Sequence, residues 1–323
     1  MVIKVCKTTE WSDRDWETYV IGYNEVFGTD ETIADFKNKY FSVCKGYSLH
    51  SLLVSDEGDV VGGITIIPCN YRCHQGFFLN GLAVDVFIRE SFRIDPLMLR
   101  KLYKQLVGTL KEEGIEVVTA VPNATAYPYW KNIVKWKDIG EISYWVIPIK
   151  INKLLNLKFC GWLFEGLTRI YLFCVLCLSY WVSLGKSKAK DYAYEIDKDD
   201  RYIQNKFHGT KYANFSVQDI FYSYRIVNEE GIKTAYIIEA TQEGKRSIKA
   251  FLKVIKVILQ QNVDLIIYVG KMGLFQLLFI KVPKRLEPKK LPLMCDVLIP
   301  NDKFSDIYDI NNWDFGLLNY DVR

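Results

Sequence analysis

The stretch from residue 79 to residue 140 constrains the fold most, because its hydrophobic period changes from that of a strand to that of a helix. Between Leu79 and Ile88, apolar residues occupy every second position: Leu82, Val84, Val86 and Ile88. A period of two predicts one face of a half-buried strand. The segment Pro96–Leu110 has a helical period, with an apolar stripe at Leu99, Leu102, Leu106 and Leu110. A strand followed by an amphipathic helix is therefore expected.

The ends of this helix and the segment after it are also predicted. Asp95 and Pro96 form a favourable pair for the start of the helix, and Gly114 is placed to end it. The β-branched run 115–121 predicts a central strand. Asn123 is placed to cap a second helix directly after that strand.

The other elements follow from the same kinds of pattern. Before this stretch we expect a strand at 1–7, helices at 13–27 and 31–41, and an antiparallel meander at 49–55, 60–67 and 77–88. Late in the chain we expect a hairpin at 221–227 and 233–239, a helix at 248–259, a strand at 263–269, a helix at 273–282 and a strand at 291–299.

The segments NGLAVDVFIRESFRIDPLMLRKLYKQLV and PNATAYPYWKNIVKWKDIGEI, together with this element order, resemble the GNAT superfamily of N-acyltransferases. In that family the turn after the fourth strand, written Arg/Gln-x-x-Gly-x-Gly/Ala, offers backbone N–H groups to the pyrophosphate of acyl-CoA, and the next helix points its N-terminus at that charge. The resemblance covers about residues 1–150. It implies an α+β fold of a mixed, mainly antiparallel sheet flanked by helices, and acetyl-CoA or another acyl-CoA as cofactor.

The resemblance also implies a set of site residues. The cofactor-binding candidates lie on the fourth strand, in its turn and after the fifth strand: Val84, Val86, Arg93, Ile94, Asp95 and Asn123. The catalytic candidates are Asp85, Glu90 and Tyr127, because acyl transfer needs a base for the amine and an acid for the leaving thiolate. The alternation of the strand directs Asp85 away from the apolar stripe, towards a groove or solvent.

Each of these candidates also has a plain structural alternative. Asp85 and Glu90 are alternatively solvated or helix-capped carboxylates. Arg93 is alternatively a surface arginine that pairs with Glu90 or Asp95, and Tyr127 a core tyrosine. The sequence also departs from the family pattern. If Arg93 begins the pyrophosphate turn, Pro96 and Met98 stand at its glycine positions, and proline removes a backbone donor.

Two lysines mark further departures. Lys131 aligns with the family's tyrosine acid, and Lys135 aligns with the glycine of its Gly-Phe pair. A non-catalytic GNAT-like binding or scaffold protein therefore stays open as an alternative to the enzyme.

A strongly apolar segment separates the two halves, and it contains the run FCGWLFEGLTRIYLFCVLCLSYWVSLG. Its uncharged part, 170–184, is shorter than the about 18–20 residues of a membrane-spanning helix. We expect a connector at 151–190 that is a helix buried between two domains, a peripheral membrane contact through 159–184 or, despite its length, a membrane-spanning helix. Lysines on both sides of the segment favour contact with a membrane surface.

The second half, 191–323, repeats the element order of the first rather than its residues, which predicts a degenerate second GNAT-like domain. TQEGKRS at 241–247 falls where its pyrophosphate turn would lie. The closing segment NNWDFGLLNYDVR resembles the C-termini of tandem-GNAT proteins from bacterial surface-polysaccharide gene clusters.

Composition limits the other functions. The net charge of +4 supports no nucleic-acid partner, and the N-terminal segment has no apolar core of a secretory signal, so we expect a cytoplasmic protein. The eight cysteines lie mostly in apolar runs, which is typical of reduced core thiols. Cys69, Cys73 and His74 have no matching second ligand pair, so we expect no metal site.

We therefore expect an acyl-CoA-dependent N-acetyltransferase whose acceptor is an amine, such as an amino sugar of a surface glycan. A Fem-type aminoacyl transferase that uses charged transfer RNA is a further alternative, and it requires a basic groove. The oligomeric state has no signal in the sequence.

Overall fold

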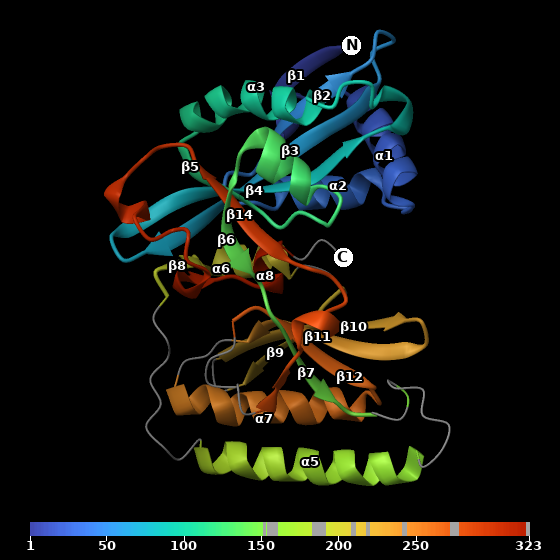
Figure 1. Ribbon diagram of the computed structural model, residues 1–323, viewed down its shortest axis with the longest axis vertical. Coiled ribbons are helices and arrows are strands. Elements are labelled where there is room, and N and C mark those ends of the chain that lie inside the picture. Colours follow the sequence, from blue (N-terminus) through green and yellow to red (C-terminus); the bar gives the residue numbers. More distant parts are fainter. Residues whose placement is uncertain are drawn as a thin grey trace. The chain divides into compact units, whose positions relative to one another are not determined.

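The computed structural model describes residues 1–150, 153, 161–182, 192–207, 211–217, 220–240, 244–271 and 278–320. The chain folds into two compact units, and each is discontinuous in sequence (Figure 1). Unit 1 comprises Met1–Glu141, Tyr192–Lys206 and Lys289–Trp313. Unit 2 comprises Ile142–Asp191, Phe207–Pro288 and Asp314–Arg323. Each unit thus includes segments from both sides of the apolar stretch. The expected division at 150 and 190 stays a prediction.

The sheet of unit 1 is mixed, and β4 and β5 are the parallel pair along its main path. Its strand order is β1 (Val2–Lys7), β2 (Leu49–Val54), β3 (Val60–Cys73), β4 (Gly76–Ile88), β5 (Ile115–Ala120), β14 (Pro292–Val297) and β6 (Lys137–Glu141). The other neighbours on this path are antiparallel. Two short strands extend the edge beside β3, namely β8 (Tyr194–Ile196) and β15 (Trp313–Asp314).

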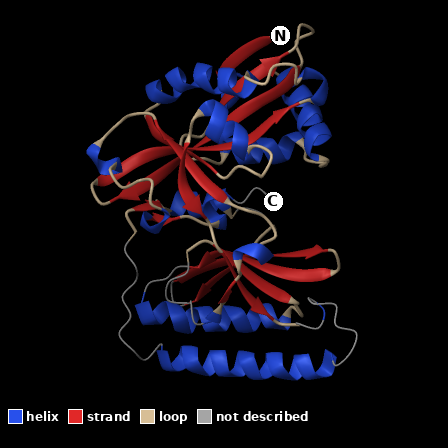
Figure 2. Ribbon diagram, in the orientation of Figure 1, coloured by secondary structure: helices blue, strands red, loops and turns tan. Residues whose placement is uncertain are grey.

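Helices cover both faces of this sheet (Figure 2). One core lies beneath α1 (Asp13–Phe27) and α2 (Ile33–Phe41). The other lies beneath α3 (Met98–Glu112) and the π-helix η3 (Tyr129–Val134). The remaining helical segments of unit 1 are short: η1 (Thr8–Glu10), η2 (Glu90–Phe92), α6 (Asp200–Lys206), η6 (Asp302–Phe304) and η7 (Ile310–Asn312). The expected α+β fold, with a mixed sheet between helices, is confirmed for this unit.

Local sequence signals set most of these boundaries. The Ser12 hydroxyl accepts a hydrogen bond from the Asp15 amide at the start of α1, and Gly28 ends the helix at φ +64°. The predicted start of α3 was two residues too early. The Asp95 carboxylate instead accepts the Leu97 amide at 2.8 Å, so Asp95 and Pro96 form the turn before Met98.

The sheet of unit 2 is also mixed, with β11 parallel to β12. Its order is β13 (Ile280–Lys281), β7 (Tyr144–Pro148), β12 (Leu265–Val269), β11 (Ile232–Ala240), β10 (Ile220–Glu229) and β9 (Ala213–Val217). The helices of unit 2 that the structure describes include α5 (Gly161–Val182), α7 (Gly244–Gln260), η5 (Lys284–Leu286) and α8 (Leu317–Tyr320). The prediction of a helix at 273–282 is wrong at 280–281, because these two residues pair with β7. Residues 273–277 of this prediction lie outside the described residues.

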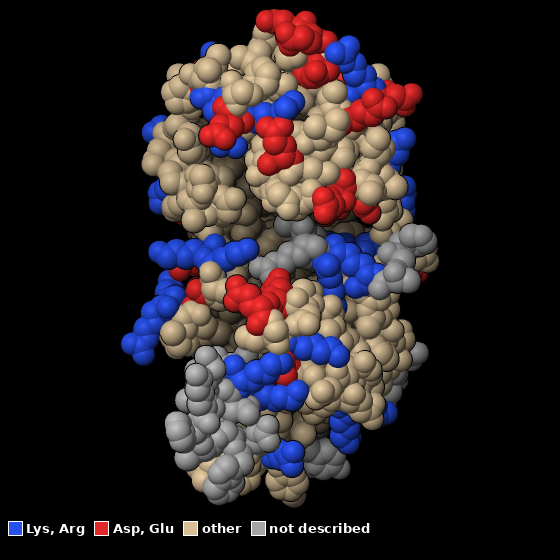
Figure 3. All heavy atoms as spheres, turned by 90° about the vertical axis from the view of Figure 1, so that its right-hand side faces the viewer, with Lys and Arg blue, Asp and Glu red and all other residues tan. Residues whose placement is uncertain are grey.

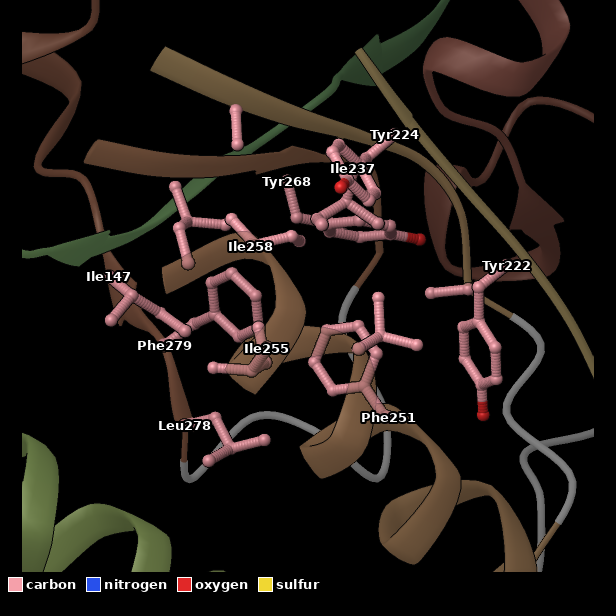
Figure 4. Close-up of a cluster of buried hydrophobic side chains, with 14 of the residues drawn as sticks. Ile147, Tyr222, Tyr224, Ile237, Phe251, Ile255, Ile258, Tyr268, Leu278 and Phe279 are labelled. Carbon is pink, nitrogen blue, oxygen red and sulfur yellow. The ribbon is translucent and has the colours of Figure 1, made fainter. Parts of the chain in front are cut away.

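The core of unit 2 lies between its sheet and α7. Phe251, Ile255 and Ile258 of α7 point towards the strand residues Tyr222 and Ile237 (Figure 4). Each of these five side chains is at most 1% exposed. The helical period predicted for 248–259 therefore reflects this buried face.

The six strands of the unit 2 sheet each have a counterpart in the unit 1 sheet, in the same order, whereas β1, β8 and β15 of unit 1 have none. The order β2-β3-β4-β5-β14-β6 in unit 1 corresponds to β9-β10-β11-β12-β7-β13 in unit 2, with the same parallel pair. In unit 1 the place between β5 and β6 is filled by β14, which follows most of unit 2 in sequence. In unit 2 the place between β12 and β13 is filled by β7, which follows β6 directly. The two units therefore exchange one strand each.

Candidate functional site

The end of β4 contains a β-bulge next to the point where β4 and β5 stop pairing. The parallel ladder between β4 and β5 ends at Leu82 and Thr119. Asp85 and Val86 then lie opposite the single residue Ile64 of β3, and Asp85 has φ +52°. A bulge leaves one residue out of the ladder and bends its strand. Beyond Leu82, the backbone N–H and C=O groups of β4 therefore do not pair with β5.

Asp85 is held by two side chains of α2. Its carboxylate lies 2.7 Å from the Lys39 ammonium and accepts the Tyr40 hydroxyl at 2.6 Å. Because Tyr40 donates its proton to Asp85, Tyr19 donates to Tyr40 across 2.6 Å. The Asp85 side chain is only 3% exposed. The expectation that it faces a groove or solvent was therefore wrong, since the bulge turns it into the core beneath α1 and α2.

The hydrogen bonds continue from Tyr19 to a buried histidine. The hydroxyls of Tyr19 and Thr65 are 3.3 Å apart, and Thr65 is bonded in turn to Nδ1 of His50 at 3.0 Å. Nε2 of His50 is bonded to the Thr8 hydroxyl at 2.8 Å. Burial lowers the pKa of His50 to about 3, so the imidazole stays neutral. Burial also raises the pKa values of Tyr19 and Tyr40, and the nearby Asp85 raises them further.

The turn after β4 places the predicted phosphate contacts at the surface. Arg93 is exposed, and its Nε donates to the Ile88 carbonyl at 2.7 Å rather than pairing with a carboxylate. Ile94 is 74% exposed. Asp95 pairs with Lys101 at 2.8 Å, and this hydrogen bond lowers the pKa of Asp95. Glu90 is exposed at the first position of η2.

The segment after β5 contains a second polar cluster. The Tyr127 hydroxyl donates to Asp138 at 3.0 Å and accepts a hydrogen bond from Lys131 at 2.9 Å. Lys131 also pairs with Asp138 at 2.5 Å, and the hydrogen bonds to Asp138 and Tyr127 raise the pKa of Lys131. Asn123 caps the turn by accepting the Ala126 amide at 2.8 Å.

Lys135 has the conformation expected of the glycine with which it aligns. It ends η3 at φ +75° and ψ +30°, a left-handed conformation that favours glycine. The next residue, Trp136, is buried in the core beneath α3. The backbone shape of the predicted Gly-Phe stretch is thus present although the glycine is not.

The structure brings some predicted residues together and separates others. Val84 is buried and Val86 half-buried on either side of Asp85, next to the end of the parallel ladder. Asp85 is joined by side-chain bonds to Lys39 and Tyr40, which the sequence analysis missed, whereas Tyr127 is bonded to a different pair. The amphipathic pattern of α2 gave no signal for Lys39, because a lysine on a helix is ordinarily solvated. Among the described residues, no group of histidine, cysteine and acidic side chains is placed to hold a metal ion.

No protein-family model and no curated protein sequence matches the chain. Solved structures do match its fold. A probable N-acyltransferase of unknown function from Enterococcus faecalis aligns with 93% of this chain and 73% of its own, at 11% identity and a TM-score of 0.58. A GCN5-related N-acetyltransferase from Anabaena variabilis aligns with 91% of this chain and 73% of its own, at 13% identity and a TM-score of 0.57.

The N-myristoyltransferase of Saccharomyces cerevisiae, solved with bound myristoyl-CoA, also matches. It aligns with 91% of this chain and 82% of its own, at 11% identity and a TM-score of 0.54. This chain has a GNAT-like fold. At these identities the likeness establishes the architecture, and the activity is a separate inference.

Proposed function

We propose that the protein is an N-acyltransferase that uses acyl-CoA at the end of β4 in unit 1. The observation that carries the proposal is the bulge at Asp85, directly after the β4–β5 ladder ends at Leu82 and Thr119. Beyond that point β4 offers backbone donors and acceptors that β5 does not use. Arg93 and Asn123 are exposed on the turns that follow β4 and β5. The neighbouring structures support the cofactor class, since one of them holds myristoyl-CoA.

The proposed chemistry uses the chain's own groups for proton transfer and charge stabilisation. Acyl-CoA supplies an activated acyl group as a thioester. Glu90 is the exposed base that removes a proton from the acceptor ammonium, and Tyr127 is the acid that protonates the departing CoA thiolate. Backbone N–H groups of β4 at Val84 and Val86 are the donors proposed for the negative charge that forms on the carbonyl oxygen. The N–C bond forms first, the C–S bond then breaks, and the second proton lost by the nitrogen restores the Tyr127 hydroxyl.

Asp85 remains a candidate catalytic residue, but its contacts support a positioning role. Both its oxygens are engaged by α2, through Lys39 and Tyr40. In this arrangement it fixes the bulge that separates β4 from β5. We propose acetyl-CoA as the donor and an amine as the acceptor, such as an amino sugar in bacterial surface-polysaccharide biosynthesis. We also propose two tandem GNAT-like domains in a cytoplasmic protein.

A non-catalytic GNAT-like binding or scaffold protein is the second candidate function. The observation that favours it is the turn from Arg89 to Leu97, where Pro96 lacks an amide and the Asp95 carboxylate already accepts the Leu97 amide. This turn offers fewer free donors to a pyrophosphate than a glycine-rich turn does.

Calorimetric titration with acetyl-CoA distinguishes the two. We expect micromolar binding that weakens about tenfold in Arg93→Ala, because one charged phosphate contact is worth about 1.4 kcal/mol. The matched control is Arg201→Ala, which removes another exposed arginine, from α6. Release of free CoA in the presence of amino sugars then tests turnover. Folded protein that binds neither acetyl-CoA nor a longer acyl-CoA would contradict the enzyme and favour the scaffold.

A further inference from the structure

Helix α5 has an outer face made of large apolar side chains. Six of them are between 46% and 70% exposed: Leu163, Leu167, Ile170, Phe173, Leu178 and Trp181. At about 100° per residue these positions fall on one side of the helix. From Leu163 to Trp181 the face is about 27 Å long. Soluble monomers rarely expose so long an apolar surface, which marks it as a contact site.

The opposite side of α5 belongs to the core of unit 2. Val175 is 8% exposed, and Leu172 and Leu176 pack against the same core from α5. Figure 1 shows α7 between the sheet and α5, so α5 is the outermost layer of the unit. Helix α5 (Gly161–Val182) lies within the expected connector, and its role as a connector stays a prediction. Among the described helices, none is both long and apolar enough to cross a bilayer.

Charge is distributed unequally between the two units. Unit 1 contains 22 Lys and Arg against 27 Asp and Glu, a formal charge of −5. Unit 2 contains 20 against 11, a formal charge of +9. In the lower half of Figure 3, Lys and Arg cover more of the visible surface than Asp and Glu do. The unit that carries the apolar face is therefore strongly basic, although the whole chain is nearly neutral.

Basic residues occur next to the apolar helix in space and in sequence. Helix α7, against which α5 packs, has exposed lysines at Lys249, Lys253 and Lys256. Spacings of four and three residues put them on one side of α7. In the sequence, α5 is preceded by Lys158 and followed by Lys186, Lys188 and Lys190. Arg169 is the exposed charged residue on α5 itself among side chains that the structure describes.

We propose that the outer face of α5 binds the surface of a membrane that contains anionic lipid. The apolar side chains enter the boundary between headgroups and acyl chains, while the lysines of unit 2 contact the headgroup phosphates. Trp181 at one end of the face is the residue type that favours this boundary. The helix lies on the membrane and does not cross it. This inference rests on α5 and the charge of unit 2, and it is independent of acyl transfer.

Charge also decides against a second copy of the chain as the occupant. Two copies joined through α5 would bring two units of formal charge +9 together around one helix pair, which like-charge repulsion opposes. A membrane with anionic lipid offers acyl chains to the apolar face and negative headgroups to the basic residues around it.

Co-sedimentation of the full chain with vesicles tests the proposal. We expect binding to vesicles of phosphatidylcholine mixed with phosphatidylglycerol, weaker binding to phosphatidylcholine alone, and loss of binding as salt rises. Ile170→Glu should reduce the bound fraction at least about tenfold, because it places a charge on the inserted face. The triple change Lys249→Gln, Lys253→Gln and Lys256→Gln should weaken binding to the anionic vesicles about fivefold for each lysine that contacts the surface.

A matched control separates this face from general surface hydrophobicity. Ile21→Glu makes the same change at a residue of α1 that is 60% exposed, against 62% for Ile170, and should leave vesicle binding unchanged. Circular dichroism confirms that both variants fold. Sedimentation velocity without lipid tests the other occupant. The proposal is overturned if the protein does not bind anionic vesicles, if Ile21→Glu and Ile170→Glu weaken binding equally, or if the free protein is a dimer that Ile170→Glu dissociates.

Discussion

Units 1 and 2 share a strand order but differ at the bulge beside their parallel pair. In unit 1 the ladder ends at Leu82, and the bulge contains Asp85, which is buried and bonded to α2. In unit 2 the ladder ends at Ile237, and Ile238 is the residue left out of the pairing between β10 and β11. Ile238 is buried and apolar. The residue left out of the ladder is therefore a hydrogen-bonded carboxylate in unit 1 and an apolar side chain in unit 2, where the buried Glu239 follows it.

The connection after this bulge differs as well. Nine residues separate β4 from α3 in unit 1, and three separate β11 from α7 in unit 2. The longer connection carries the candidate groups Glu90 and Arg93. We therefore assign the proposed acyl transfer to unit 1 and the proposed membrane contact to unit 2.

The strand exchange can be tested by placing a charge in the exchanged strand of unit 1. Met294 of β14 is 0% exposed between β5 and β6. Met294→Asp should lower the stability of unit 1 by about 4 kcal/mol, because it buries an unpaired carboxylate. Hydrogen exchange should increase in β5 and β6 and stay slow in β11 and β12. Met294→Leu is the control, with a cost below about 1.5 kcal/mol. An equal increase of hydrogen exchange in the sheets of both units would show that the two units unfold together.

The polar bulge gives the next largest expected effect. Asp85→Ala leaves the Lys39 ammonium and the Tyr40 hydroxyl without their acceptor and puts alanine at φ +52°, so we expect a loss of about 3 kcal/mol in the free energy of unfolding. Asp85→Asn keeps an acceptor for Tyr40 and tolerates the left-handed conformation, so its loss should be about 1 kcal/mol. Urea unfolding followed by fluorescence measures both. Similar losses of stability in the two variants would show that the hydrogen bonds of Asp85 do not stabilise the fold.

Each unit has an ion-paired carboxylate just before the second strand of its parallel pair. Glu113 precedes β5, and hydrogen bonds from Lys45, Lys7 and Tyr47 lower its pKa to about 2. Asp264 precedes β12, and although burial opposes ionisation, Lys150 and Lys153 lower its pKa to about 2.

These depressed pKa values predict an acid-sensitive stability. The stabilisation from each carboxylate is complete above its unfolded pKa of about 4 and is lost as pH falls towards 2. Asp264→Asn and Glu113→Gln should each remove on the order of 1–2 kcal/mol at pH 7 and flatten the stability profile between about pH 4.5 and 2. The Asp264 change should be larger, because its side chain is 1% exposed against 15% for Glu113. Urea unfolding at a series of pH values measures the free energy of unfolding of each variant. If its dependence on pH between about 4.5 and 2 were the same as in the unaltered protein, the depressed pKa values would be contradicted.

The smallest effects concern two left-handed residues, one in each unit. Lys135→Gly in unit 1 should stabilise the protein by about 0.5–1 kcal/mol, because lysine is strained at φ +75°. Asn262→Gly in unit 2 should change stability by at most a few tenths of a kcal/mol, because asparagine tolerates φ +55°. Thermal unfolding compares the two. A lower melting temperature for Lys135→Gly would show that its side chain contributes more than its backbone strain costs.

The sequence predicted the elements of unit 1 well, because each depends on local signals. Ser12 and Gly28 bound α1 as expected, and the two-residue alternation of 79–88 falls within β4. The exchange of β7 and β14 was not predicted, because periodicity shows that a strand has a buried face and not which sheet it joins. The prediction of a helix at 273–282 was wrong at 280–281, because Ile280 and Lys281 form a strand that pairs with β7.

The candidate site was predicted less well than the fold. The position of Asp85 was inferred from a regular strand, but the bulge adds a residue and changes the direction of its side chain. Lys39 and Tyr40 lie about 45 positions earlier in the chain, and no local pattern relates them to Asp85. The roles of Glu90, Arg93 and Tyr127 stay predictions.

The most direct test of the assignment of acyl-CoA to unit 1 is hydrogen exchange of the full chain with and without acetyl-CoA. We expect slower exchange in residues 83–98 and 120–128 of unit 1, with no change in residues 238–247 of unit 2. The same protection should be weaker in Arg93→Ala at equal ligand concentration. Protection confined to residues 238–247 would move the cofactor to unit 2, and no protection anywhere would contradict acyl-CoA binding by this protein.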